Sequence, residues 1–590
     1  MAESIISPGV YQRENDISYI TPAPIQAGAA FVGPTVKGPD NQPLIVTSYS
    51  DYVRKFGEVL ISGSSNLEFL TSVAVKNYFQ NGGQTALVTR IVSGAYTPAQ
   101  TTFISSSAKQ STEPFVLKTL GKGVLYNNAA GQFAATASNA AYNNTDGSLV
   151  SGSGDNIRWE IANVNNALGT FSVIIRQGDD STNNKAILET FNVNLDPNSD
   201  KYIEKVIGNQ YITVGTDGLT SYNYSVGAYP NASNYVRVDA VNLPTNYYVA
   251  NDGVTVNKDA TGASYSGSLP VPGSGSFYNG TGAVKSGASY FGAIGTTSGE
   301  SQGLVHANYT ASLSLLANKD EYQFNIVSAP GLLYNAGFTA TVNSFISLAE
   351  SRGDCIAVVD LVKTGSAVSA GVDSVTAQAA SLNSSYAATY WPWLQIKSAT
   401  GRNEWVPAGT VIPGVYAFTD AASAPWFAPA GLVRGGIGGV IQAERKLTKG
   451  DRDTLYSAKV NPIATFPGSG ISVFGQKTLQ TKASALDRVN VRRLLIELKK
   501  FIGDQARNLV FEQNTISTRN KFLATVNPYL ESVVQRQGLY SYRGVMDDTN
   551  NTADVVDRNQ LVGQIFIQPA KTIEFVVLDF TIEPTGATFG

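Results

Sequence analysis

The chain has 590 residues and a formal net charge of −3, with 42 lysines and arginines against 45 aspartates and glutamates. This balance lacks the basic footprint of nucleic-acid binding, and a single cysteine, Cys355, excludes an internal disulfide. At this length, with 43% hydrophobic residues, two to four domains are expected. Met1–Ile6 lacks a basic region before an apolar run, and no stretch approaches the ~18 apolar residues of a membrane span. We therefore expect a soluble protein made in the cytoplasm, with no direct membrane insertion.

The first 24 residues hold little core material and predict an extended N-terminal arm. In this arm, Ser7–Glu14 is a turn followed by a short strand, and Thr21–Pro24 breaks the strand. Strands and helices then alternate: Ala29–Gly33, Pro43–Thr47 and Ala86–Val92 have strand patterns, and Ser50–Gly57 and Asn66–Gln80 have helical spacing. This alternation predicts an α/β domain.

The pattern changes between residues 97 and 310. Helical spacing is rare there, and short runs alternate polar and apolar residues, most clearly in Asn156–Ala162, Thr170–Arg176 and Glu189–Leu195. One helix is expected at Asn198–Ile207, with Ser199 as its cap. Because the α/β pattern then resumes, we predict an outward-facing, β-rich insertion of one or two units at 97–310. It interrupts an α/β middle domain at 25–96 and 311–433.

The remaining signals predict a C-terminal α+β domain at 434–570. A long amphipathic helix begins at Asn490, its expected cap, and reaches about Gln513. A second helix restarts at Asn527–Pro528, because Asn caps helices and Pro suits the first turn. Leu539–Met546 and Leu561–Ile567 predict two strands.

The last apolar run, Lys571–Glu583, predicts a C-terminal strand arm within 571–590. It is rich in β-branched and aromatic residues and stops at Pro584. A bare strand of this kind exposes unpaired N–H and C=O groups that invite another chain. It therefore pairs either within its own subunit or with a neighbour, and this alternative is the functional question.

The catalytic inventory of the sequence is poor. The one histidine, His306, has no G-x-S-x-G nucleophile motif beside it, and one histidine with one cysteine cannot supply a structural zinc site. The glycine-rich turns Gly435–Gly439 and Phe466–Gly470 lack the G-K-[ST] of a phosphate loop. The acidic loop Asp547–Asp557 lacks the glycine and distal Glu of a calcium loop. We expect no enzyme, no cofactor and no metal site, and Cys355 is expected to be a small core residue.

Four stretches carry a resemblance to a known family: Ser7–Glu14, Val406–Asp420 with Ala424–Ala430, Val460–Leu479, and Val489–Leu495. They resemble segments of the tail sheath proteins of contractile-tailed phages and related contractile injection machines. The resemblance covers residues 1–96 and about 315–590. Phe474 and Gln476 stand where the family often has Trp and Ala or Ser. The insertion belongs to the part of the family that varies most.

The resemblance implies a mechanical, non-enzymatic protein. The fold class it implies is multidomain, α/β and α+β, and the middle domain is similar in architecture to subtilisin-like α/β folds without a catalytic triad. Hexameric rings are expected to stack helically around a tail tube and to contract after a baseplate signal, driving the tube through a cell envelope. The implied partners are further copies of this chain, the tail tube protein, and baseplate and tail terminator proteins. The implied location is the virion, with assembly in the host cytoplasm.

Two surfaces are expected to make these contacts. The N- and C-terminal arms would each add a strand to the C-terminal sheet of a different neighbour, because two strands alone make a marginal sheet. The arm residues expected there are Val10, Tyr11, Gln12, Arg13, Glu14, Ile573, Phe575, Val577, Phe580 and Ile582. The basic face of the long helix is expected either to meet the tube or to be merely solvated; its residues are Arg492, Arg493, Lys499 and Lys500.

Two other functions remain open at this point. The Gly-, Ser- and Tyr-rich part of the insertion also suits a receptor-binding or adhesive β protein. His306 would serve a degenerate hydrolase. Electron microscopy separates a polymer, which forms tubes or helices, from an adhesive protein, which forms discrete particles.

Overall fold

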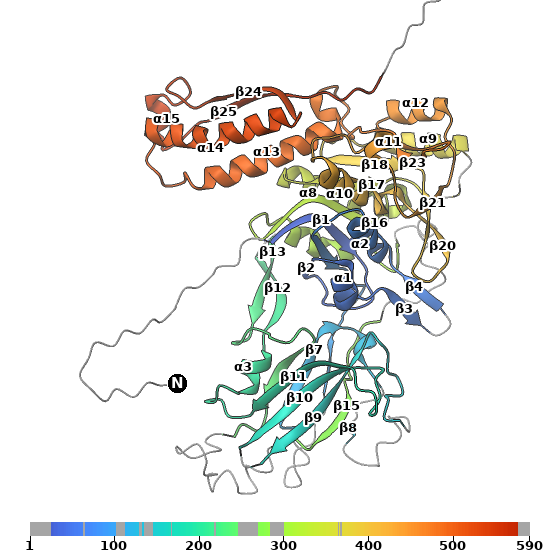
Figure 1. The fold of residues 1–590 in the computed structure, drawn as a ribbon, viewed down its shortest axis with the longest axis vertical. Coiled ribbons are helices and arrows are strands. Elements are labelled where there is room, and N and C mark those ends of the chain that lie inside the picture. Colours follow the sequence, from blue (N-terminus) through green and yellow to red (C-terminus); the bar gives the residue numbers. More distant parts are fainter. Residues whose placement is uncertain are drawn as a thin grey trace, which may run out of the picture.

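The computed structural model describes residues 25–575 except 63–64, 102–112, 129–132, 135–145, 167, 218–219, 246–268, 284–299, 364 and 366–367. Figure 1 shows a β-rich part at one end, an α/β body in the middle, and a layer of two long helices and two strands at the other end. The predicted mixed α/β, multidomain organisation is confirmed in these general terms. Among the helices described, none is long and apolar enough to cross a membrane.

The α/β body is built on an eight-stranded sheet with the order β2-β5-β1-β16-β17-β18-β22-β23. The six inner strands run parallel, whereas β2 and β23 pair antiparallel at the two edges. Parallel strands covered on both faces need continuous apolar runs, and β17 and β18 are buried throughout. The strands are β1 (Ile25–Gly33), β2 (Pro43–Val46), β5 (Ala86–Arg90), β16 (Tyr322–Leu333), β17 (Ile356–Asp360), β18 (Ala387–Trp391), β22 (Asn461–Phe466) and β23 (Gly470–Val473).

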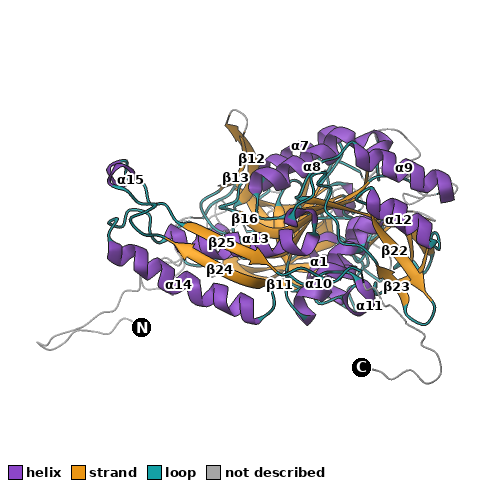
Figure 2. Cartoon of the chain, turned by 90° about the horizontal axis from the view of Figure 1, so that it is seen from above, coloured by secondary structure: helices purple, strands orange, loops and turns teal. Residues whose placement is uncertain are grey.

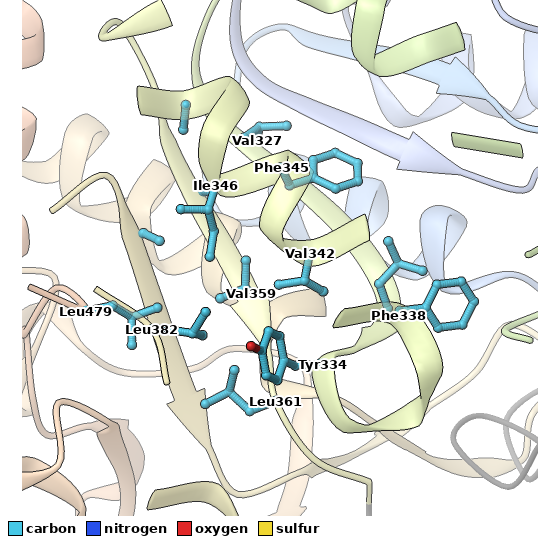
Figure 3. Close-up of a cluster of buried hydrophobic side chains, with 14 of the residues drawn as sticks. Val327, Tyr334, Phe338, Val342, Phe345, Ile346, Val359, Leu361, Leu382 and Leu479 are labelled. Carbon is cyan, nitrogen blue, oxygen red and sulfur yellow. The ribbon is translucent and has the colours of Figure 1, made fainter. Parts of the chain in front are cut away.

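Helices cover both faces of this sheet, because alternate strand residues point to opposite sides. Figure 3 shows one of the two cores, in which Phe345 and Ile346 lie near the strand residues Val327 and Val359. The helices over this core are α7 (Thr310–Leu316), α8 (Thr339–Arg352), α9 (Val368–Ala380) and α12 (Lys449–Ser457). Those over the other core are α1 (Tyr49–Phe56), α2 (Leu70–Gln80) and α10 (Ile412–Ala422).

Smaller elements border the body. β3 (Val59–Ser62) pairs with β4 (Ser65–Glu68), so the helix expected from Asn66 begins only at Leu70. A three-stranded sheet and one short helix lie farther along the chain: β19 (Leu394–Lys397), β20 (Asn403–Val406), β21 (Val440–Ala443) and α11 (Gly431–Arg434).

Two sheets of the insertion share one core. Trp159, Phe171 and Phe115 come from three different strands of these sheets and are buried together. The strands are β6 (Pro98–Gln100), β7 (Phe115–Lys122), β8 (Phe133–Ala134), β9 (Ile157–Asn165), β10 (Thr170–Gln177), β11 (Ile187–Asn194), β14 (Val236–Val241) and β15 (Gly273–Ser276), with a separate ribbon of β12 (Tyr211–Asp217) and β13 (Thr220–Val226). The expected helix Asn198–Ile207 is shorter: α3 spans Ile203–Ile207, and Ser199 does not cap it.

The insertion leaves the body and returns to it at neighbouring residues, and it also contacts the body elsewhere, for example through the ion pair of Lys37 with Asp155. The backbone N–H of Thr97 donates to the carbonyl of Thr281 at 3.0 Å, so the two ends of the insertion lie side by side. The expected end at residue 310 is too late. Gln302 already packs on the body, where its Oε1 accepts from the N–H of Leu70 at 2.9 Å and its Nε2 donates to the carbonyl of Pro330 at 3.0 Å.

The C-terminal layer contains α13 (Val489–Arg507), α14 (Ile516–Gln535), β24 (Leu539–Val545), α15 (Ala553–Asp557) and β25 (Gln564–Pro569). Figures 1 and 2 show β24 and β25 lying along the two long helices. Leu498, Leu530 and Leu539 share the core between them. This layer begins later than the expected boundary at 434, because β22 pairs with β18 and so belongs to the large sheet.

Two predicted helix boundaries are wrong. Asn490 lies inside α13 rather than capping it, and the cap position is held by Arg488 without a side-chain hydrogen bond. α14 runs unbroken through Pro528, starting at the Thr515 cap. A proline inside a helix costs about 3 kcal/mol, and the fully buried Leu530 on the same helix shows that core packing offsets this cost.

Asp360 is a buried carboxyl of the α/β body that has no ion-pair partner among the described residues. Asp360, at the end of β17, is 6% exposed, and its Oδ1 accepts a hydrogen bond from the N–H of Gly409 at 2.8 Å. Burial raises the pKa of Asp360 from its usual 3.8 to about 7, although the Gly409 hydrogen bond opposes the shift. Because the folded-state pKa exceeds the unfolded one, the ionised side chain destabilises the fold.

We expect Asp360→Asn to remove a pH dependence of stability. The unfavourable contribution of Asp360 is absent below about pH 4, grows as the pH rises toward 7, and reaches at most roughly 4 kcal/mol above that. The variant should therefore gain stability relative to the parent between pH 5 and pH 8 in thermal denaturation. The exposed Asp373→Asn is the matched control. An equal difference from the parent at both pH values would contradict this assignment.

Candidate polymerisation site

The C-terminal sheet is incomplete. β24 and β25 pair with each other over Leu539–Val545 and Gln564–Pro569, and neither has another partner among the described residues. One face is covered by the helices, and Leu539 is 2% exposed there. The other face leaves Tyr540 and Phe566 64% and 57% exposed. The two strands predicted for this domain are present, although the second begins at Gln564 rather than at Leu561. Each keeps one edge that is unpaired among the described residues, and its backbone groups can accept an added strand.

The chain beyond β25 alternates in burial. In residues 571–575, Thr572 and Glu574 are half-buried, whereas Ile573 and Phe575 are 85% and 77% exposed. This segment is not part of a strand. Figure 1 shows the chain leaving β25 and running toward α12. The two apolar side chains therefore face away from the subunit that carries them.

Glu574 is held by three side chains of the body. Its carboxylate accepts from Arg488 Nε at 2.6 Å and Nη2 at 3.0 Å, from the hydroxyl of Tyr456 at 2.9 Å, and from Gln476 Nε2 at 3.1 Å. Gln476 Nε2 also donates to the hydroxyl of Thr572. Burial alone would raise the pKa of Glu574, but these hydrogen bonds and the charge of Arg488 outweigh it and lower that pKa.

Two of the four basic residues expected on an exposed face are buried. Arg493 is 3% exposed and forms an ion pair with Asp420 at 2.5 Å, and Arg492 is 4% exposed and donates to Ser385. The guanidinium of Arg492 also stacks 3.9 Å from the ring centroid of Tyr386. Placing them on a surface was wrong, because the α/β body covers the side of α13 opposite the C-terminal core.

Lys499 and Lys500 lie farther along α13. Lys499 is exposed and Lys500 is half-exposed. Lys499 Nζ donates to the hydroxyl of Tyr386 at 3.3 Å. These two residues keep a charge that a partner can reach.

The other predicted arm residues lie outside the described part of the chain. They are Val10, Tyr11, Gln12, Arg13, Glu14, Val577, Phe580 and Ile582. Their contacts stay a prediction.

The residues considered for catalysis have structural partners. His306 Nδ1 lies 2.6 Å from the hydroxyl of Thr341. Cys355 is fully buried, as expected, and burial raises the pKa of its thiol. Across the described ranges, no group of three or more His, Cys, Asp and Glu side chains is placed to hold a metal ion.

Sequence reasoning missed the Glu574 contacts. The alternation of polar and apolar residues from Thr572 to Phe575 was visible and indicated that the two sets face different surroundings. The partners Tyr456, Gln476 and Arg488 lie about a hundred residues away, so nothing local identified them.

Comparisons with known proteins assign two domains. Residues 303–479 match the phage tail sheath protein central domain, and residues 481–583 match the phage tail sheath C-terminal domain. The chain is 33% identical to the tail sheath protein of Vibrio phage KVP40 over 354 residues, which are 56% of this chain and 53% of that protein. It is 41% identical to the tail sheath protein of Enterobacteria phage T4 over 187 residues, which are 32% of this chain and 28% of that protein. The chain thus spans about half the length of the first relative and less of the second.

A solved structure supports the same fold. The crystal structure of a sheath tail protein from Listeria innocua aligns with a TM-score of 0.50, at 11% identity, over 92% of this chain and 95% of that chain. The chain thus contains a central and a C-terminal domain that match those of phage tail sheath proteins.

Proposed function

We propose that this chain is the structural subunit of a contractile tail sheath. It polymerises as stacked hexameric rings around a tail tube and contracts to drive the tube through a cell envelope. The observation that carries the proposal is the two-stranded C-terminal sheet, both edges of which are unpaired among the described residues. Two strands are marginal alone, and two edges can receive one strand from each of two neighbours.

The added strands come from the two arms. Val10–Glu14 supplies one, and the C-terminal arm, with Val577, Phe580 and Ile582, supplies the other. Ile573 and Phe575 support this direction, because they are apolar and turned away from their own subunit. Strands joined across subunits keep the lattice connected while the bodies rotate during contraction.

The α/β body serves as a scaffold rather than as an enzyme. We propose that it has a subtilisin-like α/β architecture without the catalytic triad. The contact of His306 with Thr341, rather than with a serine nucleophile, supports a structural role. The insertion faces outward from this scaffold, away from the tube.

Lys499 and Lys500 are the remaining candidates for tube contact. A tube surface rich in carboxylates would attract them, and each exposed pair would contribute only ~0.2–1 kcal/mol. Many such weak contacts together would hold the sheath in register with its tube, and each would still break when the sheath contracts. Baseplate and tail terminator proteins are the proposed partners at the two ends. The subunit assembles in the host cytoplasm and ends up in the virion.

Ending the chain at Phe575 tests the proposal. This truncation keeps the Glu574 contacts but removes the rest of the C-terminal arm, so we expect a folded monomer that forms no tubes. Thermal denaturation checks the fold, and electron microscopy and sedimentation check the polymer. A synthetic peptide of residues 571–590, added to the full chain, should block assembly by occupying the open edge, whereas a scrambled peptide should not. Tubes formed by the truncated chain would refute the arm exchange.

Charge reversal tests the tube contact. Lys499→Glu with Lys500→Glu should weaken assembly on purified tubes several-fold at low salt, with a smaller effect at high salt, because screening weakens exposed charge pairs. The matched control is Lys482→Glu with Lys521→Glu, which reverses two other exposed lysines. Equal assembly by both variants in a co-sedimentation assay would place the tube contact elsewhere.

The adjacent ends of the insertion allow a deletion test. Deleting residues 98–280 and joining Thr97 to Thr281 through a short Gly/Ser linker should leave a chain that still polymerises, because those two residues are already adjacent. Electron microscopy of the deletion variant checks this. Loss of tubes with the body still folded would assign the insertion a role in the lattice.

A further inference from the structure

The base of the C-terminal arm is fastened to a different part of the subunit from the sheet it leaves. β25 ends at Pro569 in the C-terminal layer. Five residues later, Glu574 is bound by Tyr456 of α12, by Gln476 beyond β23, and by Arg488 at the start of α13. The arm thus crosses from the C-terminal layer to the α/β body before it continues.

The contacts form a built recess rather than a chance surface pair. Gln476 is 3% exposed, and the side chains of Arg488 and Glu574 are 26% and 17% exposed. Arg488 meets both carboxylate oxygens, a paired geometry that fixes the orientation of the carboxylate as well as its position. Asp487 binds the remaining Nη1 of Arg488 at 2.9 Å and holds the guanidinium in place.

The same contacts decide which side of the arm is free. Gln476 binds both Thr572 and Glu574, which are two residues apart and so lie on one edge of an extended segment. Ile573 and Phe575 then lie on the opposite edge, where they are exposed. Turning the segment over would bury Ile573 against Arg488 and leave the Glu574 carboxylate without its donors.

We propose that Glu574, held by Arg488, Tyr456 and Gln476, is the positioning residue of the C-terminal arm: it fixes the point of departure of the arm and presents Ile573 and Phe575 to a second copy of this chain. This inference rests on the proposed function, because it concerns the arm that joins subunits. It adds that the arm stays fastened to its own subunit as far as Glu574, beyond the end of the C-terminal sheet near residue 568. It also assigns Arg488 a role in assembly. Arg488 has this role without touching a neighbouring subunit, because it holds Glu574 of its own chain.

Limited proteolysis of the monomer tests the fastening without any polymer. Trypsin cleaves after Lys571, which is exposed, but cleavage requires the neighbouring residues to leave the body. Release of the fragment 572–590, followed by mass spectrometry, should be about tenfold faster in Glu574→Gln than in the parent, because the ion pair with Arg488 is replaced by weaker hydrogen bonds to an uncharged amide. Tyr456→Phe, which removes one donor and keeps the ring, should accelerate release by about threefold. Asp453→Asn is the matched control, since it neutralises an exposed carboxylate on α12 that does not bind Glu574 or Arg488, and it should change release by less than about twofold.

Assembly of the same variants tests the positioning role. Glu574→Gln should raise the protein concentration needed for tube formation by about fivefold to tenfold, with an unchanged melting temperature. Fragment release at the parental rate in Glu574→Gln would overturn the fastening. Faster release with normal assembly would overturn the positioning role while leaving the sheath function intact. Failure of the parent chain itself to form tubes would refute the proposed function and, with it, the positioning role.

Discussion

Helix α13 is the constraint on which the arrangement of the chain depends. Eight of its first ten residues are buried, although its sequence is amphipathic. Val489 and Ile496 belong to a core of the α/β body, whereas Leu494 and Leu498 belong to the C-terminal core. A helix shared by two cores cannot turn against either without opening packed surface. The body and the C-terminal layer therefore hold one geometry, and the unpaired sheet edges are fixed relative to the whole subunit.

Polar contacts set the rotation of that helix. Arg493 binds Asp420, and Arg492 donates to Ser385. Apolar packing alone would leave the rotation of α13 about its axis ambiguous, and these contacts define it. Arg493 is 3% exposed, whereas the side chain of Asp420 is 31% exposed. Separating the two leaves the buried guanidinium without its countercharge, which costs up to ~3–5 kcal/mol. A rotated α13 would incur that cost while keeping most of its apolar burial. The ion pair thus contributes more to orientation than to overall stability.

The features that could be predicted from the sequence are those that depend on a short-range pattern of residue types. Strands such as β17, whose first four residues are apolar, and the two strands of the C-terminal sheet follow from residue type and spacing. The helical spacing of α13 correctly placed Arg492 and Arg493 on the face opposite the leucines. It could not show that the α/β body covers that face and buries both arginines. The unbroken passage of α14 through Pro528 also depends on distant packing. The Glu574 contacts join residues about a hundred positions apart, so only the folded chain brings them together.

The position of Arg488 links the arm to this central helix. Arg488 is the residue immediately before α13, so a pull on Glu574 passes into the helix that both cores hold. Without that contact, the pull would reach β25 directly and would peel an edge strand whose hydrogen bonds break one at a time, at ~0.5–1.5 kcal/mol each. With the contact between Glu574 and Arg488, the load does not pass through β25, the strand with which the arm of a neighbour would pair. In the proposed sheath, each subunit can then be pulled through its own arm while its open edges keep the shape that receives the arms of others.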